Sequence, residues 1–458
     1  MNTLEQVLDL RKKQAEFFAT GKTREIGFRR ESLKRLKGSI KAHEDDIKKA
    51  LRLDLNKSSF ESYATEIGLV LNEINTFINK VSRWAKSQRI GTSVFAFPSK
   101  SFVVPEPYGQ VFIISPWNYP FQLPMVPLVG AIAAGNVVII RQSRFSPETN
   151  KVVREILSET FPQELAAIIE TDLEVAEEVL RLSWDMIFFT GSTPVGKKIY
   201  SSAAVNLTPV VLELGSKSPV VVDEDASIGL AARHIIWGKL INAGQTCISP
   251  DYLFVHEKIK DKLIVRLKNE IIKMYGAKPL DNPDYPRLIS GKAFDRMLSY
   301  LENKQIITGG SSDREKLSVE PTLIEARQDD KCMSEEIFGP VLPVMPFRDI
   351  EEVIWFINSR PRPLSIYFYS RNRKSQRKMQ HNTTSGAFLV NEMIVHFANN
   401  NLPFGGVGES GVGRYHGRES FRAFSNMKAV MKNNTGIDFP LRYPPFGKKE
   451  RIIKWLIK

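Results

Sequence analysis

One of the two cysteines in this 458-residue chain, Cys247, stands in a segment suited to covalent chemistry. It follows a small, flexible Ala-Gly step and lies between the hydroxyl residues Thr246 and Ser249. Glu213, an isolated carboxylate between two leucines, precedes it in the chain. A thiolate is a strong nucleophile once a base has removed the proton of the thiol. The pattern predicts a nucleophilic cysteine with Glu213 as its base, against the alternative of a buried structural cysteine.

The remaining cysteine and the histidines indicate no second reactive centre. Cys332, between a lysine and a methionine, is more typical of a loop or core thiol than of a nucleophile. Two cysteines far apart in a long chain argue against a disulfide framework and favour a reducing compartment. The six histidines show no metal-ligand spacing, and packing or pocket lining explains His396 and His416 better. We therefore expect no metal site.

Several further segments have distinctive sequences, and their order along the chain is informative. They are Pro105–Gly109, Ser115–Pro120 (SPWNYP), Phe189–Gly196 (FTGSTPVG), Glu335–Pro340 (EEIFGP), Asn401–Gly411 (NLPFGGVGESG) and Tyr415–Gly417 (YHG). Together with the segments around Glu213 and Cys247, they resemble motifs of the aldehyde dehydrogenase superfamily, and the tail resembles its class-3 branch. Each motif alone would be weak to moderate, but their common order identifies the chain as a member.

The resemblance implies a reaction that the residues can support. Cys247 attacks an aldehyde to form a thiohemiacetal, whose oxygen needs hydrogen-bond donors fixed in advance. The side-chain amide of Asn118 and the backbone N–H of Cys247 are the expected donors, against the alternative of a turn asparagine before a proline. Hydride transfer to NAD or NADP leaves a thioester. Glu213, with a pKa raised by desolvation, would then activate the water that hydrolyses it; the alternative is a strand-end glutamate in an ion pair.

A glycine-containing loop is the expected cofactor site, although it lacks the GxGxxG spacing of ordinary dinucleotide folds. It follows a predicted strand and would begin a helix whose N-terminal amides face the pyrophosphate. Thr193 is a candidate N-cap with Pro194 at the first helical position. The resemblance adds contacts to the cofactor from the Ser192 hydroxyl, Trp117, Glu336 (nicotinamide ribose) and Phe338 (nicotinamide ring). The full predicted set is Ser115, Trp117, Arg141, Arg144, Gly191, Ser192, Thr193, Pro194, Val195, Gly196, Glu336 and Phe338.

The pair Arg141 and Arg144 departs from the family pattern, which usually has a lysine and often a glutamate three residues later. Without the carboxylate, repulsion of a 2′-phosphate is removed, and a guanidinium can bind phosphate through two hydrogen bonds. We expect NADP to be accepted at least as readily as NAD. The alternative is that one arginine replaces the lysine and the other faces solvent.

The pattern of elements predicts an α/β protein. Residues 1–84 are expected to be mostly helical, and 92–104 to form an extended arm. Buried strands are predicted at 109–114, 137–140, 186–189, 210–214 and 218–222, separated by helical stretches that indicate parallel βαβ units. The resemblance implies a Rossmann-like NAD(P)-binding domain (1–84 and 107–214), an α/β catalytic domain (215–415) and a β-arm with tail for oligomerisation (85–106 and 416–458).

Composition fits a soluble enzyme of two or three domains. Hydrophobic residues make up 42% and charged residues 25%, both ordinary for a globular fold. The net charge of +13 is interleaved with acids, so we expect no nucleic-acid binding. No secretory signal or spanning segment is predicted, and the expected location is the cytoplasm. The basic, apolar C-terminus, residues 448–458, would make weak contact with a membrane surface or pack on a subunit.

The class-3 resemblance suggests a homodimer that oxidises medium- to long-chain aliphatic or aromatic aldehydes. The 27 phenylalanines allow an apolar pocket but do not locate it. Two rivals remain, an enzyme that passes the acyl group to coenzyme A and a non-enzymatic protein on the same fold. Glu213 favours hydrolysis over acyl transfer, and the set of Cys247, Glu213 and Asn118 speaks against an inactive protein. A cysteine protease is disfavoured because no histidine stands in a partner motif.

Overall fold

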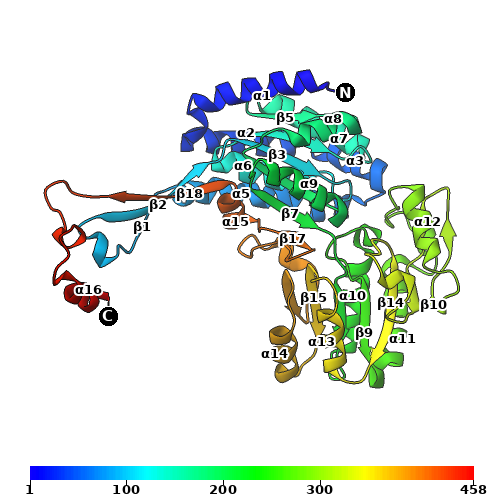
Figure 1. Cartoon of the computed structure of the whole chain (residues 1–458). Helices are drawn as coiled ribbons and strands as arrows, with labels where there is room; N and C mark the ends of the chain where they lie inside the picture. Colours follow the sequence, from blue (N-terminus) through cyan, green and yellow to red (C-terminus); the bar gives the residue numbers. More distant parts are fainter. Residues whose placement is uncertain (458) are drawn as a thin grey trace.

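Two mixed α/β units and a projecting arm make up the molecule (Figure 1). The computed structural model describes residues 1–457, with side chains at all of these positions except 95, 456 and 457. Each unit is built round a mostly parallel sheet, of six strands in one and seven in the other. The α/β class predicted from the sequence is therefore confirmed.

The six-stranded sheet has the strand order β17-β7-β6-β3-β4-β5, in which only β17 is antiparallel to its neighbour. Its strands are β3 (Gln110–Ser115), β4 (Val137–Gln142), β5 (Ala166–Ile169), β6 (Met186–Gly191), β7 (Val210–Leu214) and β17 (Gly411–Val412). The connecting helices are α6 (Gln122–Ala134), α7 (Pro147–Thr160), α8 (Leu173–Arg181) and α9 (Thr193–Val205).

This sheet contains a crevice at the point where its strand order reverses. After β3 the chain proceeds through β4 to β5 on one side, and then returns to build β6 and β7 on the other. The connections that follow β3 and β6 therefore diverge, and ligands of open α/β sheets bind at such a switch point. Ser115 and Gly191, which both belong to predicted motifs, end these two strands.

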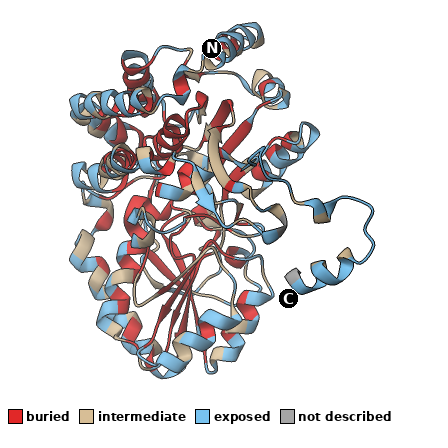
Figure 2. Ribbon diagram, turned by 90° about the vertical axis from the view of Figure 1, so that its left-hand side faces the viewer, coloured by how far each residue is buried: buried red, intermediate tan, exposed pale blue. Residues whose placement is uncertain are grey.

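Five predicted strands match β3, β4, β6, β7 and β8 (Pro219–Val222) to within two residues at each end. Helices cover both faces of a parallel sheet, so its central strands are apolar along their whole length rather than alternating. The first four residues of β3 and of β4 are all buried, as this arrangement requires. Figure 2 shows the same pattern, with buried strands between helices that are exposed on their outer sides.

An N-terminal helical layer packs against the six-stranded sheet through α6, every residue of which is buried. As predicted, residues 1–84 are mostly helical. The layer comprises α1 (Leu4–Ala19), α2 (Ile26–Ala42), α3 (Glu44–Leu55), α4 (Ser59–Ser62), a π-helical segment (Tyr63–Ile67) and α5 (Gly68–Trp84). The wider π turn lies between α4 and α5.

The seven-stranded sheet has the order β10-β13-β14-β9-β8-β15-β16 and is parallel except at β10. Its further strands are β9 (Tyr252–His256), β10 (Ile306–Thr308), β13 (Thr322–Glu325), β14 (Val341–Phe347), β15 (Ser365–Tyr369) and β16 (Ala387–Val390). Its helices are α10 (Ile228–Leu240), α11 (Lys260–Tyr275), α12 (Gly291–Ser299), α13 (Ile350–Asn358) and α14 (Arg373–Asn382). A small hairpin, β11 (Ser312–Asp313) and β12 (Ser318–Val319), lies beside it.

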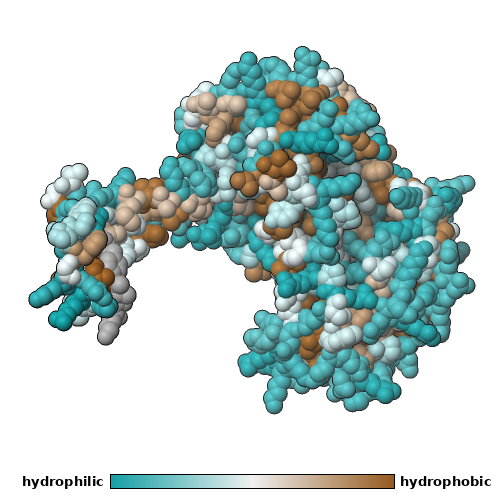
Figure 3. Space-filling model, viewed as in Figure 1, coloured by the Kyte–Doolittle hydropathy of each residue, from teal (hydrophilic) through white to brown (hydrophobic). Residues whose placement is uncertain are grey.

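The arm projects from the body and carries the last helix at its tip (Figure 1). It consists of β1 (Gln88–Ile90), β2 (Lys100–Pro107) and β18 (Ser425–Lys432), and α15 (Gly417–Ala423) joins β18 to the body. The extended arm predicted over 92–104 begins with a 3₁₀ turn, Val94–Ala96. Hydrophobic atoms gather along the arm (Figure 3). None of the helices in residues 1–457 is long and apolar enough to cross a membrane.

Candidate active site

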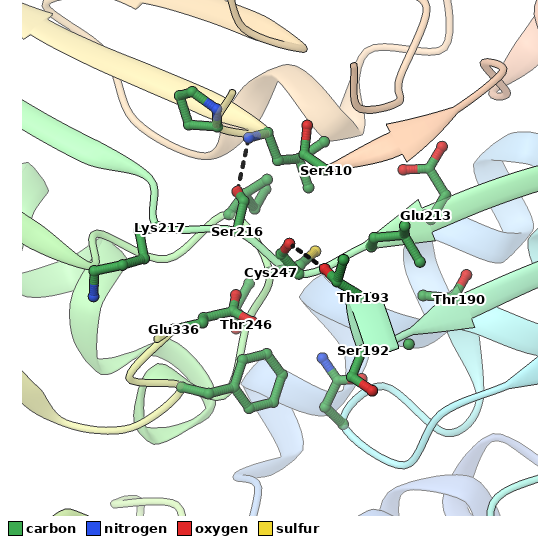
Figure 4. A pocket seen from close by; sticks show the side chains of 18 of the residues that line it. Thr190, Ser192, Thr193, Glu213, Ser216, Lys217, Thr246, Cys247, Glu336 and Ser410 are labelled. Carbon is green, nitrogen blue, oxygen red and sulfur yellow. Dashed lines mark hydrogen bonds between the residues drawn. The ribbon is translucent and has the colours of Figure 1, made fainter. Parts of the chain in front are cut away.

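A cavity of about 580 Å³ lies between the two units, where the switch point of the six-stranded sheet meets the loops of the other. It brings together ten of the predicted residues, which come from separate elements (Figure 4). They are Trp117, Asn118, Gly191, Ser192, Thr193, Pro194, Glu213, Cys247, Glu336 and Phe338. Five predicted cofactor residues do not line this cavity: Ser115, Arg141, Arg144, Val195 and Gly196.

The loop that carries Cys247 has an unusual backbone. Asn242, Ala243 and Gly244 follow α10 with φ angles of 51°, 51° and 77°, in the left-handed region that residues with a Cβ rarely adopt. Such strain persists only where neighbours over-determine it. Here the buried amide of Gln245 donates to the carbonyl of Asn242 at 3.1 Å and accepts the N–H of Ile289 at 3.0 Å. The loop is therefore fixed before any ligand binds.

Cys247 is held as a neutral thiol. Burial raises its pKa well above the ordinary value, and the nearby carboxyls of Glu336 and Glu213 raise it further. The backbone N–H groups of Cys247 and Ile248 oppose this effect. In Figure 4 the sulfur lies at the centre of the cavity, between the sides occupied by Glu213 and Glu336. A base or an added positive charge is needed before the thiol can ionise.

Glu213 is a buried carboxyl without a hydrogen-bond partner. Neither of its oxygens is paired with any group in the described part of the chain, and the residue is 4% exposed. Burial raises its pKa well above the usual range, with a weak opposing effect from Arg414. An unpaired buried carboxyl is costly in structural terms, so it is more typical of a group that exchanges protons. The ion pair considered as the alternative is absent among the residues described.

Asn118 lies in the turn after β3, and its side chain points to the cysteine loop. Its Nδ2 donates to the carbonyl of Gln245 at 3.0 Å. A side-chain amide has two N–H donors, so one remains for a ligand in the cavity. The backbone carbonyl of Asn118 accepts hydrogen bonds from Lys57 Nζ at 3.2 Å and Asn242 Nδ2 at 2.8 Å. The turn is thus anchored from two directions.

The glycine loop leads into α9, but the predicted helix start was wrong by one residue. Thr193 is the first helical residue, and Ser192 occupies the N-cap position. The Thr193 hydroxyl instead donates to the carbonyls of Gly215 (3.3 Å) and Glu409 (3.2 Å). A Cβ on Gly196 would lie 2.4 Å from the side chain of Leu214, so this glycine allows α9 to approach β7 closely. The first backbone N–H groups of α9 have no partner within the helix, as at any helix start.

Glu336 and Phe338 line the opposite wall of the cavity. A Cβ on Gly215 would lie 2.2 Å from Glu336 Oε2, so the carboxyl rests directly against the glycine backbone. Burial raises the pKa of Glu336 to about 8, opposed by the backbone N–H of Ser216. The rings of Phe338 and Trp117 meet edge to face with centroids 5.6 Å apart. Two motifs far apart in the sequence thus contribute one aromatic residue each to the same part of the cavity lining.

Arg141 and Arg144 lie at the carboxyl end of β4, beside the end of β3. Arg141 Nε donates to the hydroxyl of Thr171 at 3.1 Å, and burial lowers its pKa. Arg144 is exposed and lies over the ring of Phe145 at 5.8 Å. Neither guanidinium is paired with a carboxylate within residues 1–457. Ser115, at the end of β3, is buried with its hydroxyl unpaired among those residues.

Comparison with known proteins decides what this cavity belongs to. The model of the aldehyde dehydrogenase family matches residues 2–430. The 4,4'-diaponeurosporen-aldehyde dehydrogenase of Staphylococcus aureus is 43% identical over 96% of this chain and 97% of its own length. The chain belongs to the aldehyde dehydrogenase family. It is an oxidoreductase that acts on aldehydes with NAD or NADP.

Other relatives of this aldehyde dehydrogenase agree. Aldehyde dehydrogenase family 3 member A2 of Pongo abelii is 40% identical over 93% of this chain and 89% of its own. A substrate-bound structure of Staphylococcus aureus AldH superposes with a TM-score of 0.97 at 42% identity, and the match covers 100% of both chains. The resemblance noted in the sequence, including its class-3 character, is confirmed.

Two histidines of the dehydrogenase pack against the same aromatic ring. His396 and His416 stack with Phe404, with ring centroids 5.7 and 5.2 Å apart. Burial lowers the pKa of both to about 4, so they are neutral at physiological pH. His416 also lines the cavity. No group of three His, Cys, Asp or Glu residues suited to a metal ion occurs in the described chain.

Several charged residues near the site were missed by sequence analysis. Lys217 lines the cavity, forms an ion pair with the buried Asp251, and donates to the carbonyl of Glu335 at 2.7 Å. Its place four residues after Glu213 was an available signal. Lys57 and Glu66, by contrast, stand in residues 1–84, for which the sequence predicted only that they are mostly helical. No local pattern distinguishes them from their exposed neighbours.

The raised pKa of Cys247 leads to a prediction for its alkylation in the absence of cofactor. The rate with iodoacetamide should rise about tenfold per pH unit up to pH 10 without a plateau, because only the thiolate reacts. Mass spectrometry of labelled protein measures the rate. Cys247→Ser is the control, since Cys332 is 1% exposed and should remain unlabelled. A plateau at or below pH 8 would contradict a thiol held neutral by burial.

Proposed function

We propose that this chain is a class-3-type aldehyde dehydrogenase in which Cys247 carries the acyl group and Glu213 activates water. The principal support is that the sulfur shares one cavity with a carboxyl that has no hydrogen-bond partner among the described residues and whose pKa is raised by burial. The preferred substrates are medium- to long-chain aliphatic or aromatic aldehydes. An apolar part of the lining supports this preference; it includes Tyr119, Leu123, Ile241, Ile394, Phe397 and Phe404.

The first step forms a bond between Cys247 Sγ and the aldehyde carbon. The thiol proton passes to the carboxylate of Glu213, and the carbonyl π electrons move to oxygen. The free N–H of Asn118 and the backbone N–H of Cys247 donate to this oxygen. Because the cavity is buried and the donors are already in place, their effect on the developing charge is large.

Collapse of the thiohemiacetal releases hydride and leaves a thioester on Cys247. NAD or NADP, when bound, accepts this hydride. Glu213 first releases the thiol proton to solvent; it then takes a proton from water as the water oxygen attacks the thioester carbon. The C–S bond breaks, the leaving thiolate takes that proton back from Glu213, and the carboxylic acid is released. A raised pKa suits Glu213 to both directions of proton transfer.

The residues around the switch point fit a dinucleotide. The amides at the start of α9, in the loop Gly191–Gly196, are suited to the pyrophosphate, with the Ser192 hydroxyl beside them. The Glu336 carboxyl is suited to the nicotinamide ribose hydroxyls, and Phe338 with Trp117 to the ring. The buried, unpaired Ser115 hydroxyl lies on the same edge.

Replacing the proposed water-activating group should separate the two halves of the reaction. Glu213→Gln should still form about one NADH per site, in a slower burst because the thiol must then lose its proton to solvent, and hydrolysis should slow by about 10²–10⁴-fold because no base remains. Stopped-flow absorbance and intact mass of the acyl-enzyme measure both effects. Glu73→Gln, another buried carboxyl whose pKa is raised to about 7, is the matched control outside the cavity.

Full steady-state turnover by Glu213→Gln would exclude the proposed role. An enzyme that transfers the acyl group to coenzyme A, the rival function, would instead need coenzyme A for turnover and release an acyl-coenzyme A. Cys247→Ser should show neither burst nor turnover in either case. A protein without activity on this fold would show no acylation with any aldehyde.

The arginine pair at the end of β4 supports acceptance of NADP at least as readily as NAD. Arg144→Glu should lower kcat/KM for NADP by about tenfold or more, since a guanidinium that binds phosphate is replaced by a repelling charge. The value for NAD should change little, and Arg154→Glu on α7 is a surface control. A strong preference for NAD in the native enzyme, unchanged by Arg144→Glu, would defeat this proposal.

We also propose that two copies assemble through the arm, and that the domains divide at 1–84 with 107–214, 215–415, and 85–106 with 416–458. The division at 214/215 follows the two sheets, since β7 and β8 belong to different sheets, although β17, within 215–415, pairs with β7 in the six-stranded sheet. The arm is a three-stranded sheet with exposed apolar side chains, such as Phe97 at 60% and Met431 at 60%, and it lacks a core of its own. A second copy would cover them.

The helix at the tip, α16 (Lys449–Ile457), supports weak contact with an anionic membrane surface by an otherwise cytoplasmic enzyme. Trp455 is 76% exposed and Ile452 46% exposed, beside several cations. The last residue of this predicted segment, Lys458, lies outside the described residues. Packing on a partner subunit remains the alternative.

A flotation assay tests this contact. The enzyme should float with vesicles containing anionic lipid but not with neutral vesicles, and salt should release it because surface charges are screened. Removal of residues 433–458 should abolish flotation and leave aldehyde oxidation intact. Absence of binding, or binding that survives the truncation, would contradict a membrane role for α16.

A further inference from the structure

A buried ion pair in the N-terminal helical layer has no part in the steps described above. The side chains of Lys57 and Glu66 are both fully buried, and Lys57 Nζ lies 2.5 Å from Glu66 Oε1. Taking two charges out of water is costly, and the mutual attraction of such a pair often fails to compensate. Its value to the protein is therefore better sought in the other groups that the pair contacts.

Both members of the pair bind the turn that carries Asn118. Glu66 Oε2 accepts the backbone N–H groups of Phe121 at 2.9 Å and Gln122 at 3.0 Å, at the start of α6. Lys57 Nζ donates to the carbonyl of Asn118 at 3.2 Å. It also lies 3.9 Å from the centre of the ring of the next residue, Tyr119. One ion pair thus holds the turn at its two ends.

The backbone round Glu66 is shaped for this contact. Glu66 belongs to the π-helical segment, in which Thr65, Glu66 and Ile67 are buried in succession. An amphipathic surface helix of ordinary pitch buries residues three and four apart rather than three in succession. The wider turn keeps the carboxyl directed inward. π turns of this kind are frequent at functional sites.

The contacts leave the Asn118 side chain with a single direction. One N–H of its amide donates to the carbonyl of Gln245, in the loop before Cys247. Its backbone carbonyl is held by the Lys57 cation and by the side-chain amide of Asn242, which belongs to the same loop. The position of the second N–H relative to the sulfur therefore depends on how firmly the turn is anchored.

We propose that the Lys57–Glu66 pair is a positioning device for Asn118 and sets the geometry of the donors that stabilise the thiohemiacetal oxygen. The inference rests on the proposed function of Asn118 as one of these donors. Lys57 and Glu66 touch neither substrate nor cofactor and act only through the turn. Their loss should slow formation of the acyl-enzyme while leaving cofactor binding unchanged.

A double-mutant cycle tests this coupling. The amplitude and rate of the first NADH burst are measured for the native enzyme, Lys57→Met, Asn118→Ala and the double variant. Lys57→Met should slow acylation by about 10- to 100-fold, because small displacements of an aligned donor are costly. In the Asn118→Ala background the same change should have no further effect on acylation, since coupled residues are not additive. The KM for NAD should change less than twofold.

Arg29→Met is the matched control. Arg29 is a buried cation that donates to the carbonyl of Ala133 at 3.2 Å, at the opposite end of α6. Its loss should lower Tm as Lys57→Met does but leave the burst rate within twofold. If Lys57→Met fails to fold, the neutral pair Lys57→Gln with Glu66→Gln retains hydrogen bonding and enters the same cycle.

Three results would overturn the inference. An effect of Lys57→Met that multiplies with that of Asn118→Ala would show that the pair does not act through Asn118. An equal loss of burst rate in Arg29→Met would show a general response to weakened packing. A burst unaffected by Asn118→Ala would remove the proposed donor role itself, which is distinguishable because it appears in the single variant.

Discussion

The burial of ionisable side chains in the cleft between the two units is the constraint on which the site depends. It raises the pKa of Cys247, Glu213 and Glu336 at once, since each must ionise where few charges compensate it. Three such groups in one low-dielectric cavity cannot all be charged together. The arrangement therefore couples proton positions to each other, and a charge supplied by a ligand changes all three.

The burial of these groups depends on which segments form the walls of the cleft. The carboxyl ends of β3 and β6 provide one side, and the strained loop before Cys247 provides another. Backbone approach is close at several points, for example where a Cβ on Gly215 would collide with Glu336. Small residues in these motifs thus bring the backbone against functional side chains, and the buried amide of Gln245 secures the strained loop.

Much of this was predictable from sequence because it is local. The strands β3, β4, β6 and β7 are largely apolar, and such runs indicate strands buried on both faces. The family motifs contain the ten predicted residues that were found in the lining of the cavity. The start of α9 was displaced by one residue because Thr193 finds its hydrogen-bond partners in distant chain segments, at Gly215 and Glu409, which no helix-start rule includes.

Other features required the folded chain. In sequence, Glu66 looks like part of an ordinary helix with an apolar face, and no local pattern indicates the π turn or the pairing with Lys57. That Glu213 lacks a hydrogen-bond partner among the described residues also depends on which segments pack around it.

The sequence alone determined which chemical groups are present, in which order, and on which kinds of element. Tertiary structure decided which of these groups are buried, which form hydrogen bonds or ion pairs, and which face one another across the cleft. The physical reason is that periodicity and turn chemistry act between residues a few positions apart. Desolvation and buried ion pairing depend instead on segments far apart in the chain, as Lys57 and Asn118 are.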